Sequence, residues 1–190
     1  MSEITAMNAN SMLPNTEHLV TAICESLDEV ARADDRVRGN WTNAICTAVE
    51  RRLDVISGEI GVCFGHERSK PKEEREFLFD FTAFILDNEP GFADWYTMQA
   101  LIVGEIEFNG DLGRDFEKLM FADSAVCFFV FPDSIKEHRP VDELDFFSKV
   151  AQKRSRSVSA RGNVPPVFVI ASYSGEHRRF MTRVIRHEPH

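Results

Sequence analysis

The chain has 190 residues, of which 31 are Asp or Glu and 22 are Lys or Arg, so its formal net charge at pH 7 is -9. Hydrophobic residues make up 43% of the chain and include 16 Phe but only 2 Trp and 2 Tyr. This composition excludes a disordered tail, a collagenous chain and a simple basic nucleic-acid coat, and the length fits one well-packed domain. Because no apolar run approaches the roughly 20 residues that cross a bilayer, and the first residues do not resemble a secretion signal, we expect a cytoplasmic protein with no membrane partner.

The cysteines and histidines do not suggest a zinc site. The four cysteines, at positions 24, 46, 63 and 127, form no CxxC pair, and the six histidines form no HxH or HxxxH pair. Zinc sites need ligands paired at such close spacings. We therefore predict free, mostly buried thiols in a reducing compartment.

The charge is unevenly distributed along the chain. The first 148 residues contain 29 acidic and 13 basic side chains, whereas the rest contain nine basic and two acidic ones. The basic run includes Lys153, Arg154 and Arg156, followed by Arg161. This segment is either a binding site for a polyanion or a solvated loop that balances the acidic body.

The first half of the chain predicts two helices followed by strands. Residues 1–15 are expected to form a flexible arm, and residues 16–190 a single domain. Apolar residues recur every three or four positions over 16–31 and 41–56, which predicts two amphipathic helices. Short strands are expected at 60–64, 77–86 and 100–108, and alternation in the second of these places Phe79 on one face with Phe81, and Asp80 on the other.

The second half predicts alternating helices and strands. Asp111 is expected to cap a helix that runs to about residue 122. Residues 125–131 are apolar on both faces, which is typical of a central strand covered on both sides. A helix is expected to begin near Pro140 and to end before a Ser- and Arg-rich loop over 153–165. Residues 167–171 predict a strand, and 180–185 fit either a helix or a strand. The order predicts an α/β domain with a mixed sheet.

Three acidic residues fall within two neighbouring apolar strands, where an unpaired charge is costly. If these strands form a hairpin, Asp80 lies beside Glu105 on one face, with Glu107 nearby. An oxygen-only cluster of this kind suits Mg²⁺ or Mn²⁺. The alternative is that Glu105 and Glu107 face water on an exposed side of an edge strand.

The succession of Asp80, then Glu105-Ile106-Glu107 at the end of the next strand, then a helix and an apolar strand, resembles the PD-(D/E)xK nuclease core. The resemblance covers roughly residues 41–131. It implies a restriction-endonuclease-like fold, with a mixed central sheet flanked by helices, and a site that binds Mg²⁺ or Mn²⁺. The residues that it implies as metal ligands are Asp80, Glu105, the backbone carbonyl of Ile106, and Glu50 on the preceding helix. Glu50 can equally be a solvent-facing helix residue.

The position of the usual lysine departs from the superfamily pattern. Glu107 stands where a lysine normally positions or activates the attacking water, although some restriction endonucleases in the superfamily have Glu there. Lys118, on the following helix, is a candidate to replace that lysine if it points back toward the sheet, and otherwise it is a surface residue. The catalytic set implied by the resemblance is therefore Asp80, Glu105, Glu107 and Lys118.

The resemblance implies a metal-dependent nuclease that hydrolyses phosphodiester bonds of DNA, as a homodimer if it cuts both strands. The basic residues that would hold the DNA backbone are Lys153, Arg154, Arg156, Arg161, Arg178 and Arg179. The alternative is a catalytically inactive protein of the same fold that binds a protein partner. The net negative charge and the missing lysine both favour this alternative.

Overall fold

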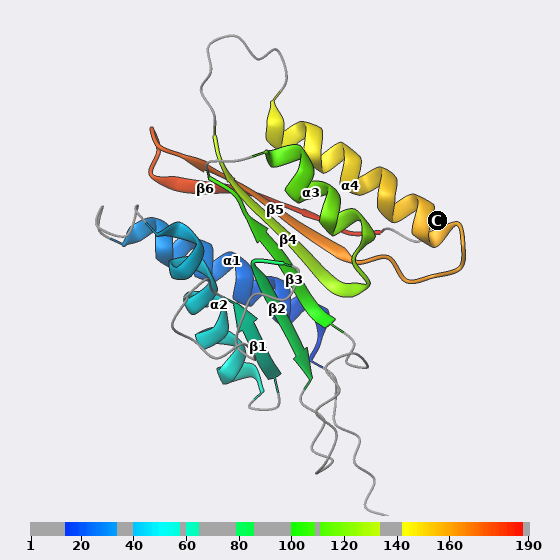
Figure 1. The fold of residues 1–190 in the computed structure, drawn as a ribbon, viewed down its shortest axis with the longest axis horizontal. Coiled ribbons are helices and arrows are strands. Elements are labelled where there is room, and N and C mark those ends of the chain that lie inside the picture. Colours follow the sequence, from blue (N-terminus) through cyan, green and yellow to red (C-terminus); the bar gives the residue numbers. More distant parts are fainter. Residues whose placement is uncertain are drawn as a thin grey trace, which may run out of the picture.

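The computed structural model describes residues 14–33, 40–57, 60–64, 79–85, 100–108, 111–133 and 142–187. Within this part of the chain, six strands form one sheet with two helices on each face (Figure 1). The helices are α1 (Thr16–Arg32), α2 (Trp41–Ile56), α3 (Leu112–Phe121) and α4 (Glu143–Ser159). The strands are β1 (Ile60–Phe64), β2 (Phe81–Ile85), β3 (Ala100–Ile106), β4 (Ser124–Pro132), β5 (Val167–Ser174) and β6 (Arg179–Ile185).

The strands lie in the sheet in the order in which they occur in the chain, β1-β2-β3-β4-β5-β6. β1, β2 and β3 pair antiparallel, β3, β4 and β5 pair parallel, and β6 returns antiparallel to β5. The predicted α/β class and mixed sheet are therefore confirmed. We call the end of the sheet where β3, β4 and β5 finish its carboxyl end. The antiparallel pairings place the start of β2 and the β5–β6 turn at this same end.

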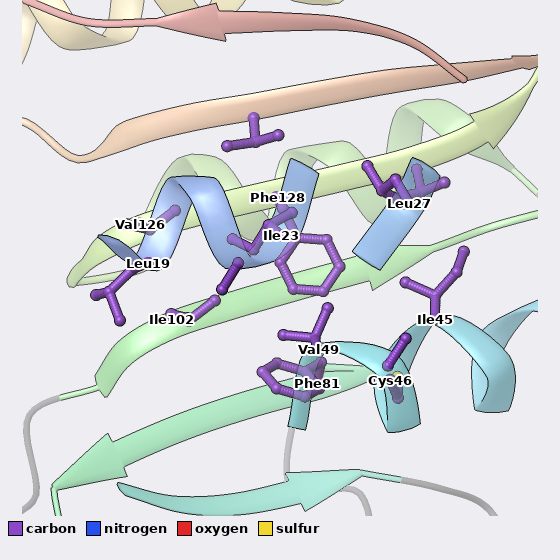
Figure 2. Close-up of a cluster of buried hydrophobic side chains, with 14 of the residues drawn as sticks. Leu19, Ile23, Leu27, Ile45, Cys46, Val49, Phe81, Ile102, Val126 and Phe128 are labelled. Atoms are coloured by element: carbon purple, nitrogen blue, oxygen red, sulfur yellow. The ribbon is translucent and has the colours of Figure 1, made fainter. Parts of the chain in front are cut away.

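α1 and α2 cover one face of the sheet. Figure 2 shows Leu19, Ile23 and Leu27 of α1 and Ile45 and Val49 of α2 facing side chains of the central strands. These side chains are almost completely buried, and their removal from water supplies the main stabilisation of this layer. The strand residues that they face include Phe81, Ile102, Val126 and Phe128.

A glycine in β3 permits the close packing of this layer. A Cβ atom built on Gly104 would lie 2.1 Å from the ring of Phe128, far inside van der Waals contact. The ring therefore occupies the space above the backbone of Gly104. This contact fixes the part of β3 that immediately precedes Glu105.

α3 and α4 cover the opposite face with a cluster of phenylalanines. The ring of Phe116 lies 5.2 Å from that of Phe129 and 4.6 Å from that of Phe147, measured between centroids. β4 contributes to both layers, with Phe128 on one face and Phe129 on the other. The prediction of a central strand apolar on both faces is confirmed, because α/β crossovers place helices on both sides.

The starts of α1 and α3 agree with the sequence pattern. α1 begins after Asn15, whose side chain accepts a hydrogen bond from the N–H of Glu17. α3 begins after Asp111, whose carboxylate accepts hydrogen bonds from the N–H groups of Gly113 and Arg114, as predicted. Of the expected N-terminal arm, residues 1–13 lie outside the described residues.

The expected strand over 77–86 is shorter in the structure. β2 begins only at Phe81, and the chain bends at Phe79 and Asp80. The expectation that Phe79 and Phe81 share a face is wrong, because Phe79 packs in the α3–α4 layer and Phe81 in the α1–α2 layer. Strand alternation does not apply across a bend. Residues 77, 78 and 86 lie outside the described residues.

The expected loop that begins at residue 153 is also wrong, because α4 continues to Ser159. Ala151, Ser155 and Val158 are buried at helical spacing, so the face that packs against the sheet extends through the basic segment. The helix ends before Gly162, whose φ of 78° suits glycine. Pro140 lies outside the described residues, and residues 180–185, which fit either type of element, belong to strand β6.

Two simpler expectations can be compared with the structure. None of the four cysteines forms a disulfide bond, and Cys46 and Cys127 are buried. Among the described residues, no helix has both the length and the apolar character needed to cross a bilayer.

Candidate functional site

The pairing of β2 with β3 brings Asp80 and Glu105 together at the carboxyl end of the sheet. Phe81 pairs with Gly104, so Asp80 and Glu105 are the next residues along the two antiparallel strands. Beyond this pair, the side chain of Asp80 continues the hydrogen bonding between the two segments. Its Oδ2 accepts a hydrogen bond of 2.7 Å from the N–H of Ile106. On the opposite side, the thiol of Cys46 donates to the Asp80 carbonyl oxygen over 3.7 Å. Asp80 is therefore held from both α2 and β3.

Glu105 is a buried acid in the middle of this group. It is only 2% exposed, and it points to the α3–α4 face together with Val103, two residues earlier in β3. Burial raises the pKa of its carboxyl to about 8, and the negative charge of Asp80 contributes in the same direction. A cation that offset the charge of Asp80 would allow Glu105 to ionise near neutral pH.

Lys118 reaches Glu105 from α3. Its Nζ lies 3.1 Å from Oε1 of Glu105 and 2.9 Å from Oδ1 of Asp115, which lies three residues earlier on the same helix. Burial of the ammonium lowers the pKa of Lys118, but the hydrogen bonds to Asp115 and Glu105 outweigh this effect and the pKa is raised. Lys118 therefore stays protonated and carries a fixed positive charge beside Asp80 and Glu105, which we call the acid pair.

The donor set of this group fits a hard divalent cation. The carboxylates of Asp80 and Glu105, with the carbonyl of Ile106 next in the chain, offer only oxygen donors, which Mg²⁺ and Mn²⁺ prefer. Within the described ranges no group of three or more His, Cys, Asp or Glu side chains is placed to hold a metal ion. Mg²⁺ sites commonly use one or two carboxylates and complete their coordination with water and substrate phosphates. Two carboxylates are thus sufficient for that type of site.

Among the described residues, neither Glu107 nor Glu50 joins Asp80 and Glu105 in a group of three placed to hold a metal ion. The charged side chains that shift the pKa of Glu105 are Asp80, Lys118 and Asp115. Glu107 follows β3, and its N–H donates to the carbonyl oxygen of Val130 over 2.9 Å. Glu50 is half-buried on α2, one helical turn beyond Cys46.

The predicted DNA-binding residues fall into two sets at opposite ends of the sheet. Arg178 lies in the β5–β6 turn and Arg179 beside it, and both are exposed. This turn is at the carboxyl end of the sheet, the end that contains Glu105. α4 leads from the carboxyl end of β4 back to the start of β5, so its C-terminal half lies at the other end (Figure 1). That half and the turn after it contain Lys153, Arg154, Arg156 and Arg161.

Sequence reasoning missed Asp115. Its carboxylate is largely shielded, with 17% of the side chain exposed, and holds the amino group of Lys118 beside Glu105. The spacing of three residues between Asp115 and Lys118 on a predicted helix was the available signal, because side chains three apart lie on one helix face.

Comparison with known proteins does not assign the chain to a family. The chain matches no protein-family model, no curated protein and no solved structure. The arrangement of Asp80, Glu105 and Lys118 is therefore the main indication of function in this chain.

Proposed function

We propose that this protein is a metal-dependent nuclease that hydrolyses phosphodiester bonds of DNA, with its site at the carboxyl end of β3. One observation carries the proposal. A buried carboxyl on β3 lies beside a second carboxylate from the adjacent strand and 3.1 Å from a lysine ammonium. Asp80 just before β2, Glu105 near the end of β3 and Lys118 on the following helix are the residues that the resemblance to the PD-(D/E)xK core implies.

Asp80 and Glu105 would hold Mg²⁺ or Mn²⁺ together with the carbonyl of Ile106. Such an ion, when bound, polarises the scissile phosphate and lowers the pKa of its water. The hydrogen bond from Ile106 to Asp80 fixes the orientation of that carboxylate before anything binds. Burial of Glu105 keeps its carboxyl in a weakly screened environment, where it interacts strongly with a cation.

Lys118 supplies the positive charge that the strand position of Glu107 lacks. Its amino group is protonated, and Asp115, on the same helix, pairs with it. In this position it would stabilise negative charge that develops on the phosphate and orient the attacking water. The side chain is 37% exposed, so a substrate can approach it from solvent.

The DNA backbone would be held close to the site by Arg178 and Arg179, which are exposed at the same end of the sheet. The phosphate backbone attracts such cations independently of sequence. The set on α4 would contact a more distant stretch of DNA. A homodimer would supply the second site that cleavage of both strands requires.

The experiment is cleavage of plasmid DNA in the presence of Mg²⁺ or Mn²⁺. We expect Asp80→Asn and Glu105→Gln to lower the rate by at least about 100-fold, because each removes stabilisation worth several kcal/mol. Lys118→Ala should lower it by about 100-fold. Glu117→Gln, an exposed acid on the same helix, is the matched control and should retain activity. Wild-type protein that leaves DNA intact with either metal contradicts the proposal.

A second candidate function is a catalytically inactive module that binds a protein partner. The observation that favours it is the contact network itself, because Lys118 already places a positive charge beside Glu105 and Asp115. In that case neither Mg²⁺ nor Mn²⁺ should raise the melting temperature, whereas a ligand of the folded state does so by mass action.

A further inference from the structure

A hydroxyl group next to the acid pair has no hydrogen-bond partner among the described residues. Thr82 is the second residue of β2, and its Oγ1 is buried although the residue as a whole is only half-buried. Buried hydroxyl groups are nearly always hydrogen-bonded, because an unpaired one loses its contacts with water and gains nothing in return. An unpaired hydroxyl in a strand therefore needs an explanation.

The register of the sheet places Thr82 on the same face as Glu105. Thr82 pairs with Val103, and directly opposite residues on neighbouring strands point to the same side. Val103 packs in the α3–α4 layer, and Glu105 is two residues further along the same strand. Thr82 and Glu105 are thus diagonal neighbours, whose separation in such sheets is about 7 to 8 Å. A glutamate side chain is long enough to cover most of this distance.

The contacts of Glu105 leave room for a further donor. Lys118 contacts only one of its two carboxylate oxygens, Oε1. An ionised carboxylate accepts several hydrogen bonds, and a buried one is stabilised when both oxygens have partners. Among the described residues, the hydroxyl of Thr82 is a donor on the correct face that is not already engaged.

We propose that Thr82 is a positioning residue of the site, whose hydroxyl donates a hydrogen bond to the carboxylate of Glu105 when that carboxylate holds a divalent cation. The inference rests on the proposed metal-dependent function. The hydroxyl orients a metal ligand and does not itself contact the cation. Without a cation the hydroxyl remains unpaired, which lowers the stability of the folded protein.

The test uses Thr82→Val, which keeps the shape of the side chain and removes the hydroxyl, and Thr82→Ser, which keeps the hydroxyl. The probe is Mg²⁺ alone, titrated by calorimetry and by thermal melting. We expect Thr82→Val to melt at the same or a higher temperature without metal, and to bind Mg²⁺ about 10- to 100-fold more weakly, as for other groups that orient metal ligands. Thr82→Ser should bind Mg²⁺ like the wild type. Thr182→Val, on the exposed side of β6, is the matched control and should change neither quantity.

Each other outcome overturns the inference. Unchanged Mg²⁺ affinity in Thr82→Val, with normal binding by the wild type, overturns it while leaving the proposed function intact. A clearly lower melting temperature of metal-free Thr82→Val overturns it as well, because the hydroxyl would then already be paired in the fold. A wild-type protein that binds neither Mg²⁺ nor Mn²⁺ overturns both the inference and the proposed function.

Discussion

At the scale of single residues, the environment of Glu105 decides what the site can do. The same burial that keeps water away from this carboxyl raises its pKa to about 8, so that near neutral pH it is mainly protonated without a cation. Lys118 opposes this shift through its hydrogen bond and its charge, but does not cancel it. Ionisation of Glu105 is therefore coupled to the arrival of positive charge, which is how a buried acid serves as a metal ligand.

This coupling predicts a pH-dependent stability. The folded-state pKa of Glu105 lies above its ordinary value of 4.5, so the folded state binds more protons than the unfolded state between about pH 4.5 and 8. Its contribution is fully present at low pH and is lost as the pH rises through this window, by at most about 1.4 kcal/mol per pH unit. We expect Glu105→Gln to remove this loss, so that the variant becomes more stable relative to the wild type as the pH rises.

Urea denaturation at pH 5, 6, 7 and 8 without divalent metal measures the difference. Glu117→Gln, which removes an exposed acid from α3, should follow the wild type at every pH. Parallel pH profiles of Glu105→Gln and the wild type would show that Glu105 is ionised throughout.

At the scale of secondary-structure elements, α4 shows how packing extends a helix through a polar segment. Residues 153–157 are all polar or charged, a composition that also fits a loop, yet Ser155 and Val158 are buried against the sheet. The helix keeps these positions on one face and leaves Lys153 and Arg156 exposed on the other. Burial of a single stripe is sufficient to hold the segment helical.

The position of Ser155 leads to a prediction for α4. Its Oγ is buried and has no hydrogen-bond partner among the described residues. Ser155→Ala removes this unpaired group and improves helix propensity, so we expect the free energy of unfolding to rise by roughly 1 kcal/mol. Ser157→Ala, at an exposed position of the same helix, is the control and should raise it by less. Equal changes in urea denaturation would indicate that both serines face solvent.

At the scale of the whole molecule, strand order determines which charged residues can act together. The parallel strands β3, β4 and β5 finish at one end of the sheet, so the acid pair and the β5–β6 turn lie at the same end. The C-terminal half of α4 lies at the opposite end, because the crossover helix runs antiparallel to the strands that it connects. Among the described residues, the two sets of predicted DNA-binding residues therefore do not form one continuous basic surface around the site.

This separation predicts different effects for the two basic sets. Replacement of Arg178 and Arg179 by Ala should weaken DNA binding and lower cleavage together, since these side chains lie at the end of the sheet that contains the site. Replacement of Lys153 and Arg156 by Ala should reduce the salt dependence of binding, by about one unit of slope per lost phosphate contact, with little effect on cleavage at saturating DNA.

Fluorescence anisotropy with a labelled duplex over a range of salt concentrations measures the slopes. Lys149→Ala, at an exposed lysine that pairs with Asp145 on α4, provides a control for the loss of one positive charge. Equal effects of both double variants on cleavage would contradict the separation.

The sequence by itself determined the features that depend on local periodicity. The helices α1, α2 and α3, the cap at Asp111 and the two-sided burial of β4 follow from the spacing of apolar and capping residues along a few turns or one strand. The adjacency of Asp80 and Glu105 was expected only if their two strands formed a hairpin, and the antiparallel pairing of β2 with β3 meets that condition.

Only the tertiary structure decided what surrounds that acid pair. The contact of Lys118 with Glu105 depends on how α3 packs over β3. The burial of the unpaired Thr82 hydroxyl depends on how β2 and β3 are covered. The early bend before β2, the full length of α4 and the division of the basic residues likewise depend on packing across the sheet. These features arise from contacts between residues distant in the sequence, which a local pattern of polar and apolar residues does not specify.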